Sequence, residues 1–97
     1  MRVVWTENAQ RHLTQIHDYI AIDSPRYALA MVDRITRRSQ QCGKFPLMAG
    51  KVLEYDREDI REVLENPYRI IYRVLADRVD ILAIIHGARR LPNELAE

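Results

Sequence analysis

Residues 60 to 86 read IREVLENPYRIIYRVLADRVDILAIIH, and most of the fold follows from this segment. It contains three runs rich in β-branched and aromatic residues with a period of two, which predicts strands at Ile60–Glu65, Tyr68–Leu75 and Val79–His86. Only residues 66–67 and 76–78 separate the runs. Because such short connections join antiparallel neighbours, the three strands should form an antiparallel meander.

Two amphipathic helices are expected upstream of the strands. Thr6 is a suitable N-cap for the first helix, which should continue to about Asp23. Its apolar residues repeat at spacings of three and four: Ala9, Leu13, Ile16 and Ile20. Ser24 and Pro25 offer an N-cap and a first-turn proline for the second helix, which Gly43 should cap at its C-terminus. With almost no loop between them, the helices should form a hairpin.

The remaining segments complete an α+β domain. A short strand is expected at Arg2–Trp5, before the first helix. The periodicity lapses between Gly43 and Asp59, so we expect a connecting loop there, with a short strand at Val52–Tyr55. The predicted architecture is an N-terminal strand and a helical hairpin followed by the three-stranded antiparallel meander. We interpret residues 1–97 as one domain.

The strand predicted at 68–75 should have two different faces. Its apolar face, which should pack on the hairpin, consists of Tyr68, Ile70, Tyr72 and Val74. Arg69 and Arg73 would then lie on the opposite face, with Ile71 between them. Two interpretations of these arginines are open: they form a basic surface for a partner, or they pair with neighbouring carboxylates such as Glu62 or Glu65.

Composition narrows the class of protein. With 47% hydrophobic and 30% charged residues, the chain resembles an ordinary globular domain. It contains no apolar stretch of the roughly 18 residues that a membrane span needs. The N-terminus becomes polar directly after Trp5, which leaves no room for a secretion signal. Cys42 has no second cysteine to pair with, so we interpret it as a small core residue in the reducing cytoplasm.

The basic residues are mostly arginine. Of the fifteen, only Lys44 and Lys51 are lysines, while the formal net charge is +1. Arginine suits bidentate contacts to carboxylates and phosphates, although codon bias alone can also replace lysine. The arginines of the strand and turn segments are expected to form one basic working face: Arg61, Arg69, Arg73, Arg89 and Arg90.

Several motifs resemble the ParE/RelE superfamily of bacterial type II toxins. They are Ile60-Arg61-Glu62, the segment YRIIYRV at 68–74 and the segment HGARR at 86–90, together with Pro25 and Phe45-Pro46. The likeness runs from Val3 to about Leu91 and is closest to the ParE branch. It implies the α+β fold predicted above and a cytoplasmic toxin of a toxin–antitoxin system, of the kind that serves plasmid stabilization, without a cofactor.

The resemblance implies one of two activities. RelE-like members cut messenger RNA in the ribosome without a metal, whereas ParE-like members bind DNA gyrase and are not known as nucleases. In a nuclease, Arg69 and Arg89 would contact the phosphate, and Glu62 or His86 would carry protons. The lysines of the RelE pattern are missing from strand 60–65, and no tyrosine follows Arg90. We therefore expect a ParE-like gyrase inhibitor with no firmly assigned catalytic residue.

Two further expectations concern partners and metals. The resemblance implies a cognate antitoxin, ParD-like or similar, and hence a hetero-oligomer; a relic that only binds its antitoxin is a third hypothesis. Contacts with target or antitoxin are expected from the five arginines of the strand and turn segments. His86 is interpreted mainly as a strand-terminal residue bonded to the backbone. His12 and His17, five positions apart, do not share a helix face, so no metal site is expected.

Overall fold

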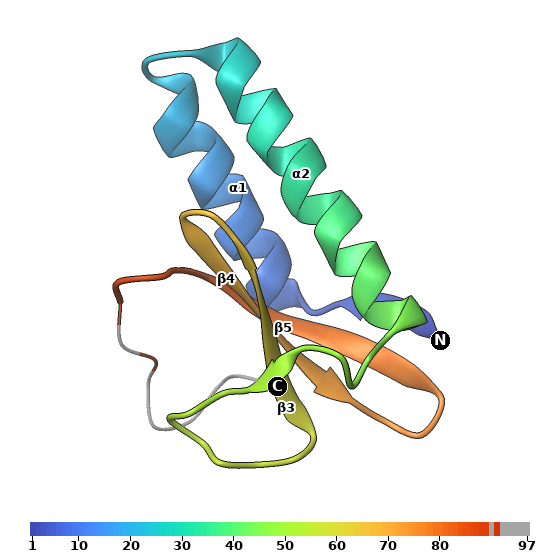
Figure 1. Cartoon of the computed structure of the whole chain (residues 1–97). Helices are drawn as coiled ribbons and strands as arrows, with labels where there is room; N and C mark the ends of the chain where they lie inside the picture. Colours follow the sequence, from blue (N-terminus) through green and yellow to red (C-terminus); the bar gives the residue numbers. More distant parts are fainter. Residues whose placement is uncertain (90, 92–97) are drawn as a thin grey trace.

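The computed structural model describes residues 1–89 and 91, and it contains a five-stranded sheet with two helices packed on one face (Figure 1). The strands are β1 (Arg2–Trp5), β2 (Gly50–Lys51), β3 (Ile60–Glu65), β4 (Tyr68–Val74) and β5 (Arg78–His86). The helices are α1 (Glu7–Ala21) and α2 (Pro25–Lys44). The predicted α+β architecture and element order are confirmed.

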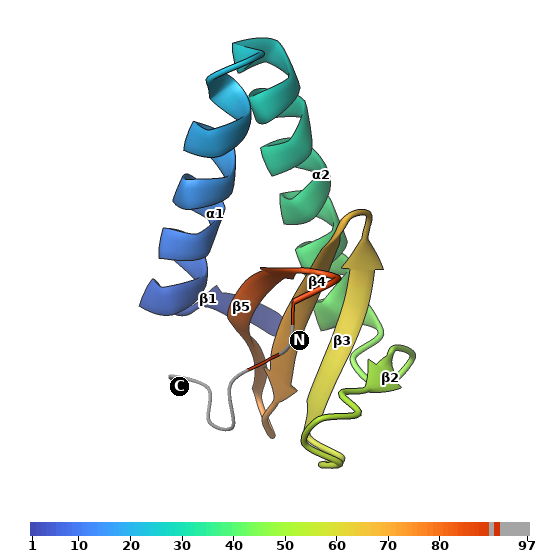
Figure 2. The same cartoon turned by 90° about the vertical axis from the view of Figure 1, so that its left-hand side faces the viewer.

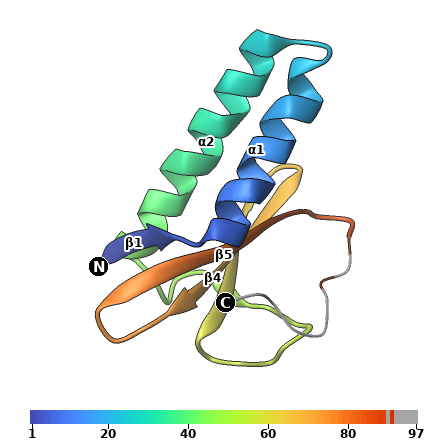
Figure 3. The same cartoon turned by 180° about the vertical axis from the view of Figure 1, so that it is seen from behind.

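The strands lie in the order β1-β5-β4-β3-β2. The meander of β3, β4 and β5 is antiparallel as predicted, and the Asn66–Pro67 peptide between β3 and β4 is cis. Strand β1 pairs with β5 in parallel, from Arg2 opposite Arg78 to Trp5 opposite Ile81. Figure 3 shows β1 beside β5, at the base of the helical hairpin. The first strand of the chain thus pairs with the last.

The helical hairpin starts as the capping residues predict. The Thr6 hydroxyl accepts a hydrogen bond from the backbone N–H of Ala9 at 3.1 Å, and Ser24 Oγ accepts one from Tyr27 at 3.1 Å. Pro25 occupies the first turn of α2. The closed end of the hairpin stands away from the sheet (Figures 1 and 2). Neither helix of the described chain is long and apolar enough to cross a membrane.

The main core lies between the hairpin and the sheet. Ile70 and Tyr72 of β4 belong to it, which confirms the predicted apolar face of this strand. Along β5 the register shifts opposite Ile71 and Tyr72, so that Leu82 has no partner on β4. Because of this bulge, Ile81 and Ile84 of β5 both face the helices although they are three positions apart.

The opposite face of the sheet carries a second core. It consists of Val52, Ile60, Ile71, Leu82, Ala83 and Leu91. Ile71, which was expected on this face between Arg69 and Arg73, is fully buried in the second core. The segment between β2 and β3 and the segment after β5 contribute Val52 and Leu91, which close this face. Neither segment has an apolar periodicity that would predict its place in a core.

The strand predicted at Val52–Tyr55 is also wrong, because β2 covers only Gly50–Lys51. The backbone carbonyl of Val52 accepts hydrogen bonds from the N–H groups of Tyr55 at 3.2 Å and Asp56 at 3.1 Å. These bonds form a turn in which Asp56 has a positive φ of 49°. Val52 itself is fully buried in the second core, so the chain turns inward instead of extending along β3.

The prediction that Gly43 caps α2 is wrong. Gly43 lies inside the helix, which continues to Lys44 and is capped by Phe45. A Cβ atom at Gly43 would lie 2.5 Å from the carbonyl oxygen of Met1 and 2.7 Å from a methyl group of Val3. The N-terminal ammonium group of Met1 donates to the carbonyl of Gly43 at 2.8 Å. This glycine is thus required for the close approach of β1 to α2.

Candidate functional site

Arg69, the second residue of the YRIIYRV segment, lies on the side of β4 that faces the second core. Its Nη1 and Nη2 atoms each donate to a carboxylate oxygen of Glu54 at 3.0 Å, and its Nε atom donates to Glu62 at 3.0 Å. Arg69 keeps only 9% of its surface exposed. Of the two interpretations of this arginine, the structure shows the pairing with Glu62. Arg69 also pairs with Glu54, which the sequence analysis did not consider as a partner.

Glu54 and the guanidinium of Arg69 stabilise each other's charged forms. Hydrogen bonds from Arg69 hold the pKa of Glu54 at about 2, and the bond to Glu54, followed by that to Glu62, raises the pKa of Arg69. Glu54 also accepts a hydrogen bond from the backbone N–H of Leu91 at 3.4 Å. Glu54 therefore links the segment before β3 to β4 through Arg69 and to the segment after β5 through Leu91.

Arg61 and Arg73 are also held by neighbouring groups. Arg61 donates to the backbone carbonyl of Ala49 at 3.0 Å and to the carboxylate of Glu58 at 3.0 Å. Arg73 donates from Nε to Asp59 at 3.2 Å. Glu65, the other carboxylate considered for the β4 arginines, instead pairs with arginines of α2: Arg34 and Arg38. The basic working face expected on β3 and β4 is thus largely neutralised within the chain.

His86 and Arg89 lie at a different place, on the helix side of the sheet. They line an open cleft of about 320 Å³, which we call the α1–β5 cleft. Its polar lining consists of His12, Gln15, Tyr19, Tyr68, His86 and Arg89. The rings of Tyr68 and His86, a cross-strand pair, meet edge to face with their centres 5.9 Å apart. The predicted site residues are therefore split between two regions.

His86 has the backbone contact expected of a strand-terminal residue, because its Nδ1 accepts a hydrogen bond from the N–H of Ala88 at 3.2 Å. The sequence did not predict His12 as a site residue. In the structure it lines the same cleft, and its Nδ1 accepts a hydrogen bond from the N–H of Ile84 at 3.1 Å. The spacing of His12, Ile16 and Tyr19 at i, i+4 and i+7 was the available signal, since it places them on one helix face. Arg90 lies outside the described residues.

A smaller pocket of about 220 Å³ lies beside the C-terminal end of α2. Cys42 lines it, with its thiol donating to the carbonyl of Arg38 at 3.6 Å, and burial raises the pKa of this thiol to about 11. The hydroxyl of Tyr72 donates to the carbonyl of Pro46 at 2.8 Å. These contacts agree with the interpretation of Cys42 as a core residue. The described residues contain no cluster of histidine, cysteine and carboxylate groups fit for a metal ion.

Comparisons with known proteins agree on one family. A family model described as "ParE toxin of type II toxin-antitoxin system, parDE" matches residues 3–91. A solved structure described as "Chromosomal ParDE TA system from P. aeruginosa" is similar, with a TM-score of 0.74 and 26% sequence identity. That similarity covers 89% of this chain and 95% of the other. No curated protein matches the sequence significantly.

Proposed function

This chain belongs to the ParE toxin family of type II toxin–antitoxin systems, and on that basis we propose that it binds and inhibits DNA gyrase and is neutralised by a cognate antitoxin. Its activity is a binding event and requires no bond-making step. We expect the chain to form one complex with gyrase and another with the antitoxin, and each complex should exclude the other.

The observation that carries this proposal is the state of Arg69. A metal-free nuclease needs an arginine available for the scissile phosphate, with proton carriers around the same phosphate. Here Glu54 and Glu62 occupy the guanidinium of Arg69, and a phosphate would have to displace both carboxylates. Glu62 is engaged in the same cluster, whereas His86 and Arg89 line the α1–β5 cleft. The four residues considered for RNA cleavage do not converge on one reacting group.

Arg89 is the best placed of the proposed contact residues. It is exposed in the turn after β5, and within residues 1–89 and 91 it has no carboxylate partner. Arg61, Arg69 and Arg73 are each paired inside the chain, so they act mainly on the shape of the surface. We therefore propose Arg89 as a direct contact with the target. A contact through Arg90 remains a prediction.

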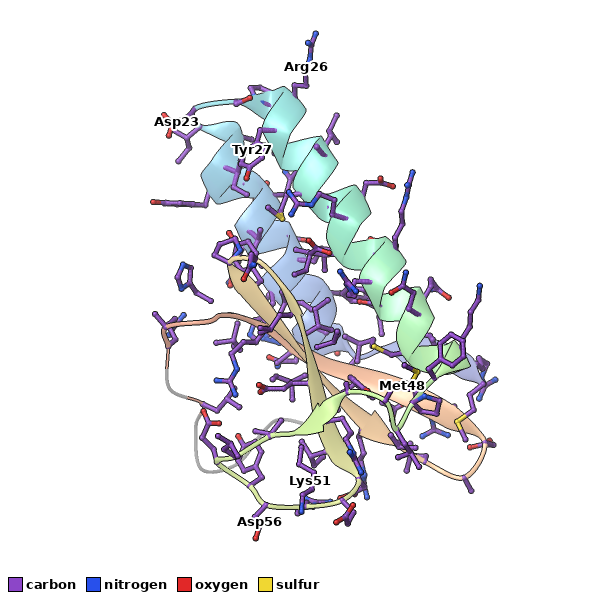
Figure 4. The ribbon with its side chains drawn as sticks, viewed as in Figure 1. Asp23, Arg26, Tyr27, Met48, Lys51 and Asp56 are labelled. Atoms are coloured by element: carbon purple, nitrogen blue, oxygen red, sulfur yellow. The ribbon has the colours of Figure 1, made fainter. Side chains whose placement is uncertain are left out.

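A pair of assays tests the proposed activity. The purified chain should inhibit supercoiling of relaxed plasmid by gyrase, while messenger RNA in translating, programmed ribosomes should stay intact. Arg89→Gln should weaken the inhibition, and Arg26→Gln should not, because Arg26 lies at the far end of the hairpin and points away from the sheet (Figure 4). Cleavage of the message with unaffected gyrase would instead identify a ribosome-dependent endoribonuclease.

The antitoxin part of the proposal has its own test. Adding the cognate antitoxin should restore supercoiling at a stoichiometric ratio and should give a stable hetero-oligomer in size-exclusion chromatography. A chain that is inert in both activity assays but binds the antitoxin tightly would be a relic of a toxin. A chain that inhibits gyrase and does not bind the antitoxin would contradict the neutralisation alone.

A further inference from the structure

We propose that the α1–β5 cleft is a carboxylate-binding site and that its occupant is an acidic side chain of the antitoxin. This inference rests on the antitoxin partner proposed above and adds the place and the chemistry of one contact. It is carried by the hydrogen-bond donors that line the cleft, by the lack of acidic groups among its lining residues, and by the apolar surface around them.

The two histidines of the cleft each offer a donor. Nδ1 of His12 accepts from the backbone N–H of Ile84, and Nδ1 of His86 accepts from that of Ala88. A neutral imidazole whose Nδ1 is an acceptor carries its proton on Nε2. Each ring therefore has an N–H donor on the edge away from the backbone. Burial, followed by the charges of Arg11 and Arg89, lowers the pKa of His12 and so favours the neutral form of its ring over the imidazolium.

Arg89 adds a charged donor that differs from the neighbouring arginines. The arginines of β3, β4 and β5 all have carboxylate partners: Arg61, Arg69, Arg73 and Arg78. Within the described residues Arg89 has none, and no aspartate or glutamate is among the residues that line the cleft. Two imidazole N–H groups and a guanidinium around one cleft are complementary to an oxyanion.

The size and the apolar part of the lining favour a carboxylate on a short aliphatic stem. The cleft of about 320 Å³ can hold one or two side chains, but not a whole helix. Ile16 and Ile84, which lie on the helix side of the sheet, supply its apolar part. Phosphate sites commonly use free backbone N–H groups, whereas the N–H groups of Ile84 and Ala88 are already bonded to the two histidines.

The surface next to the cleft favours a protein segment over a small free anion. Tyr19, which lines the cleft, is 75% exposed, and Ile22, the C-cap residue directly after α1, is 80% exposed. A peptide can place a carboxylate in the cleft and apolar side chains on this exposed part of α1. A free carboxylate or phosphate ion would leave that apolar surface in water.

Titration with small probes tests the site by itself. N-acetylglutamate N-methylamide added to the full chain should shift the ring resonances of His12 and His86 in NMR spectra, and the neutral glutamine analogue should not. Inorganic phosphate should bind more weakly than the glutamate probe. Undisturbed histidine resonances, equal shifts with the glutamine analogue, or tighter binding of phosphate would each overturn the assignment.

Two variants and one control link the shifts to the cleft. Arg89→Gln should weaken binding of the glutamate probe roughly 10-fold or more, since it removes a charge-assisted hydrogen bond. Gln15→Glu should abolish binding, because it places a carboxylate on the exposed edge of the same cleft. Arg26→Gln, at the other end of the hairpin, should leave binding unchanged (Figure 4). Equal binding by all three variants would contradict the proposal.

The Arg89 variant and the Arg26 control also test whether the antitoxin supplies the carboxylate that occupies the cleft. In the complex with the cognate antitoxin, Arg89→Gln should raise the dissociation constant by roughly 10-fold or more, and Arg26→Gln should not change it. Probe binding without this effect on the complex would overturn the antitoxin side chain as the occupant. The probe titration uses neither gyrase nor antitoxin, so a failed supercoiling assay and a failed titration point to different errors.

Discussion

At the level of single residues, Arg69 illustrates how pairing changes the meaning of a motif. In the sequence it is a cation within a recognisable segment, but in the fold it donates to two carboxylates from different parts of the chain. Its charge is used to attach the loop before β3 to the sheet. A partner that needs Arg69 would have to compete with Glu54, which is already positioned for bidentate contact.

Glu54→Gln should destabilise the protein by about 1–2 kcal/mol at pH 7, because it weakens a bidentate pair that is still partly open to solvent. The pKa of Glu54, about 2 in the folded protein, is below its unfolded value near 4.5. The stabilisation by the charged form is therefore present above pH 4.5 and is lost as the pH falls towards 2. Urea unfolding at several pH values should show the variant and the natural protein converging in acid.

Asp56→Asn is the matched control for that change. Asp56 lies in the same loop, but its side chain is 88% exposed and pairs only at the surface with Lys51. Figure 4 shows Asp56 at the outer edge of the loop. This control should change the free energy of unfolding by less than about 0.5 kcal/mol. If Glu54→Gln costs no more than Asp56→Asn, the Arg69 pair does not hold the loop.

The thiol of Cys42 should be unreactive in the folded protein. Burial raises its pKa to about 11, and the thiolate is the reactive form. Alkylation by iodoacetamide at pH 8 should therefore be slow in buffer and fast in denaturing urea, as followed by mass spectrometry. Equal rates in the two conditions would show that the pocket beside α2 opens readily.

At the level of elements, α2 and β1 depend on each other through Gly43. A glycine inside a helix lowers helix stability relative to alanine by about 1 kcal/mol. Here a glycine is needed because the backbone of Met1 lies against the helix at this position. The N-terminal ammonium group also donates a hydrogen bond to the carbonyl of Gly43. Replacement of this glycine therefore acts on the packing of two elements and not on the helix alone.

Gly43→Ala should destabilise the protein by about 1–3 kcal/mol, since the new methyl group would collide with the backbone of Met1 and a methyl group of Val3. Gly50→Ala is the control, because no atom lies within 4 Å of a Cβ at that position. Thermal unfolding followed by circular dichroism compares the two variants. A stabilising effect of Gly43→Ala would mean that helix propensity outweighs the contact with β1.

At the level of the whole molecule, one sheet separates two cores. The helical hairpin covers one face, and Val52 and Leu91 close the other. This arrangement buries both sides of β4, so that Ile70 and Ile71 are both fully buried although they point in opposite directions. Figure 2 shows the hairpin on one side of the sheet and β2 next to β3, at the edge of the sheet.

Ile71→Ala should cost about 2–4 kcal/mol in the free energy of unfolding, a cost typical of a residue in a closed core. Leu53→Ala is the control: Leu53 belongs to the loop beside Val52, but it is 91% exposed. That change should stay within about 0.5 kcal/mol. Urea denaturation measures both. A cost for Ile71→Ala as small as that of the control would show that the second core contributes little to stability.

The elements could be predicted because they depend on local patterns. The period of two from Ile60 to His86, the hydroxyl caps at Thr6 and Ser24, and the short connections between strands predict the helices and the antiparallel meander with small errors at the ends. These signals involve residues that are neighbours in the chain. Backbone hydrogen bonding and side-chain periodicity act over the same short range.

The state of the candidate site depends instead on residues far apart in the chain. Glu54 and Arg69 are separated by 15 positions, and the His12 ring meets the Ile84 backbone across 72 positions. No local pattern indicates that Glu54 would turn inward and neutralise Arg69, or that Arg89 would lie beside His12. Sequence motifs were sufficient to identify the family, but folding determines which arginines are paired, because an ion pair forms only where the chain brings opposite charges into contact.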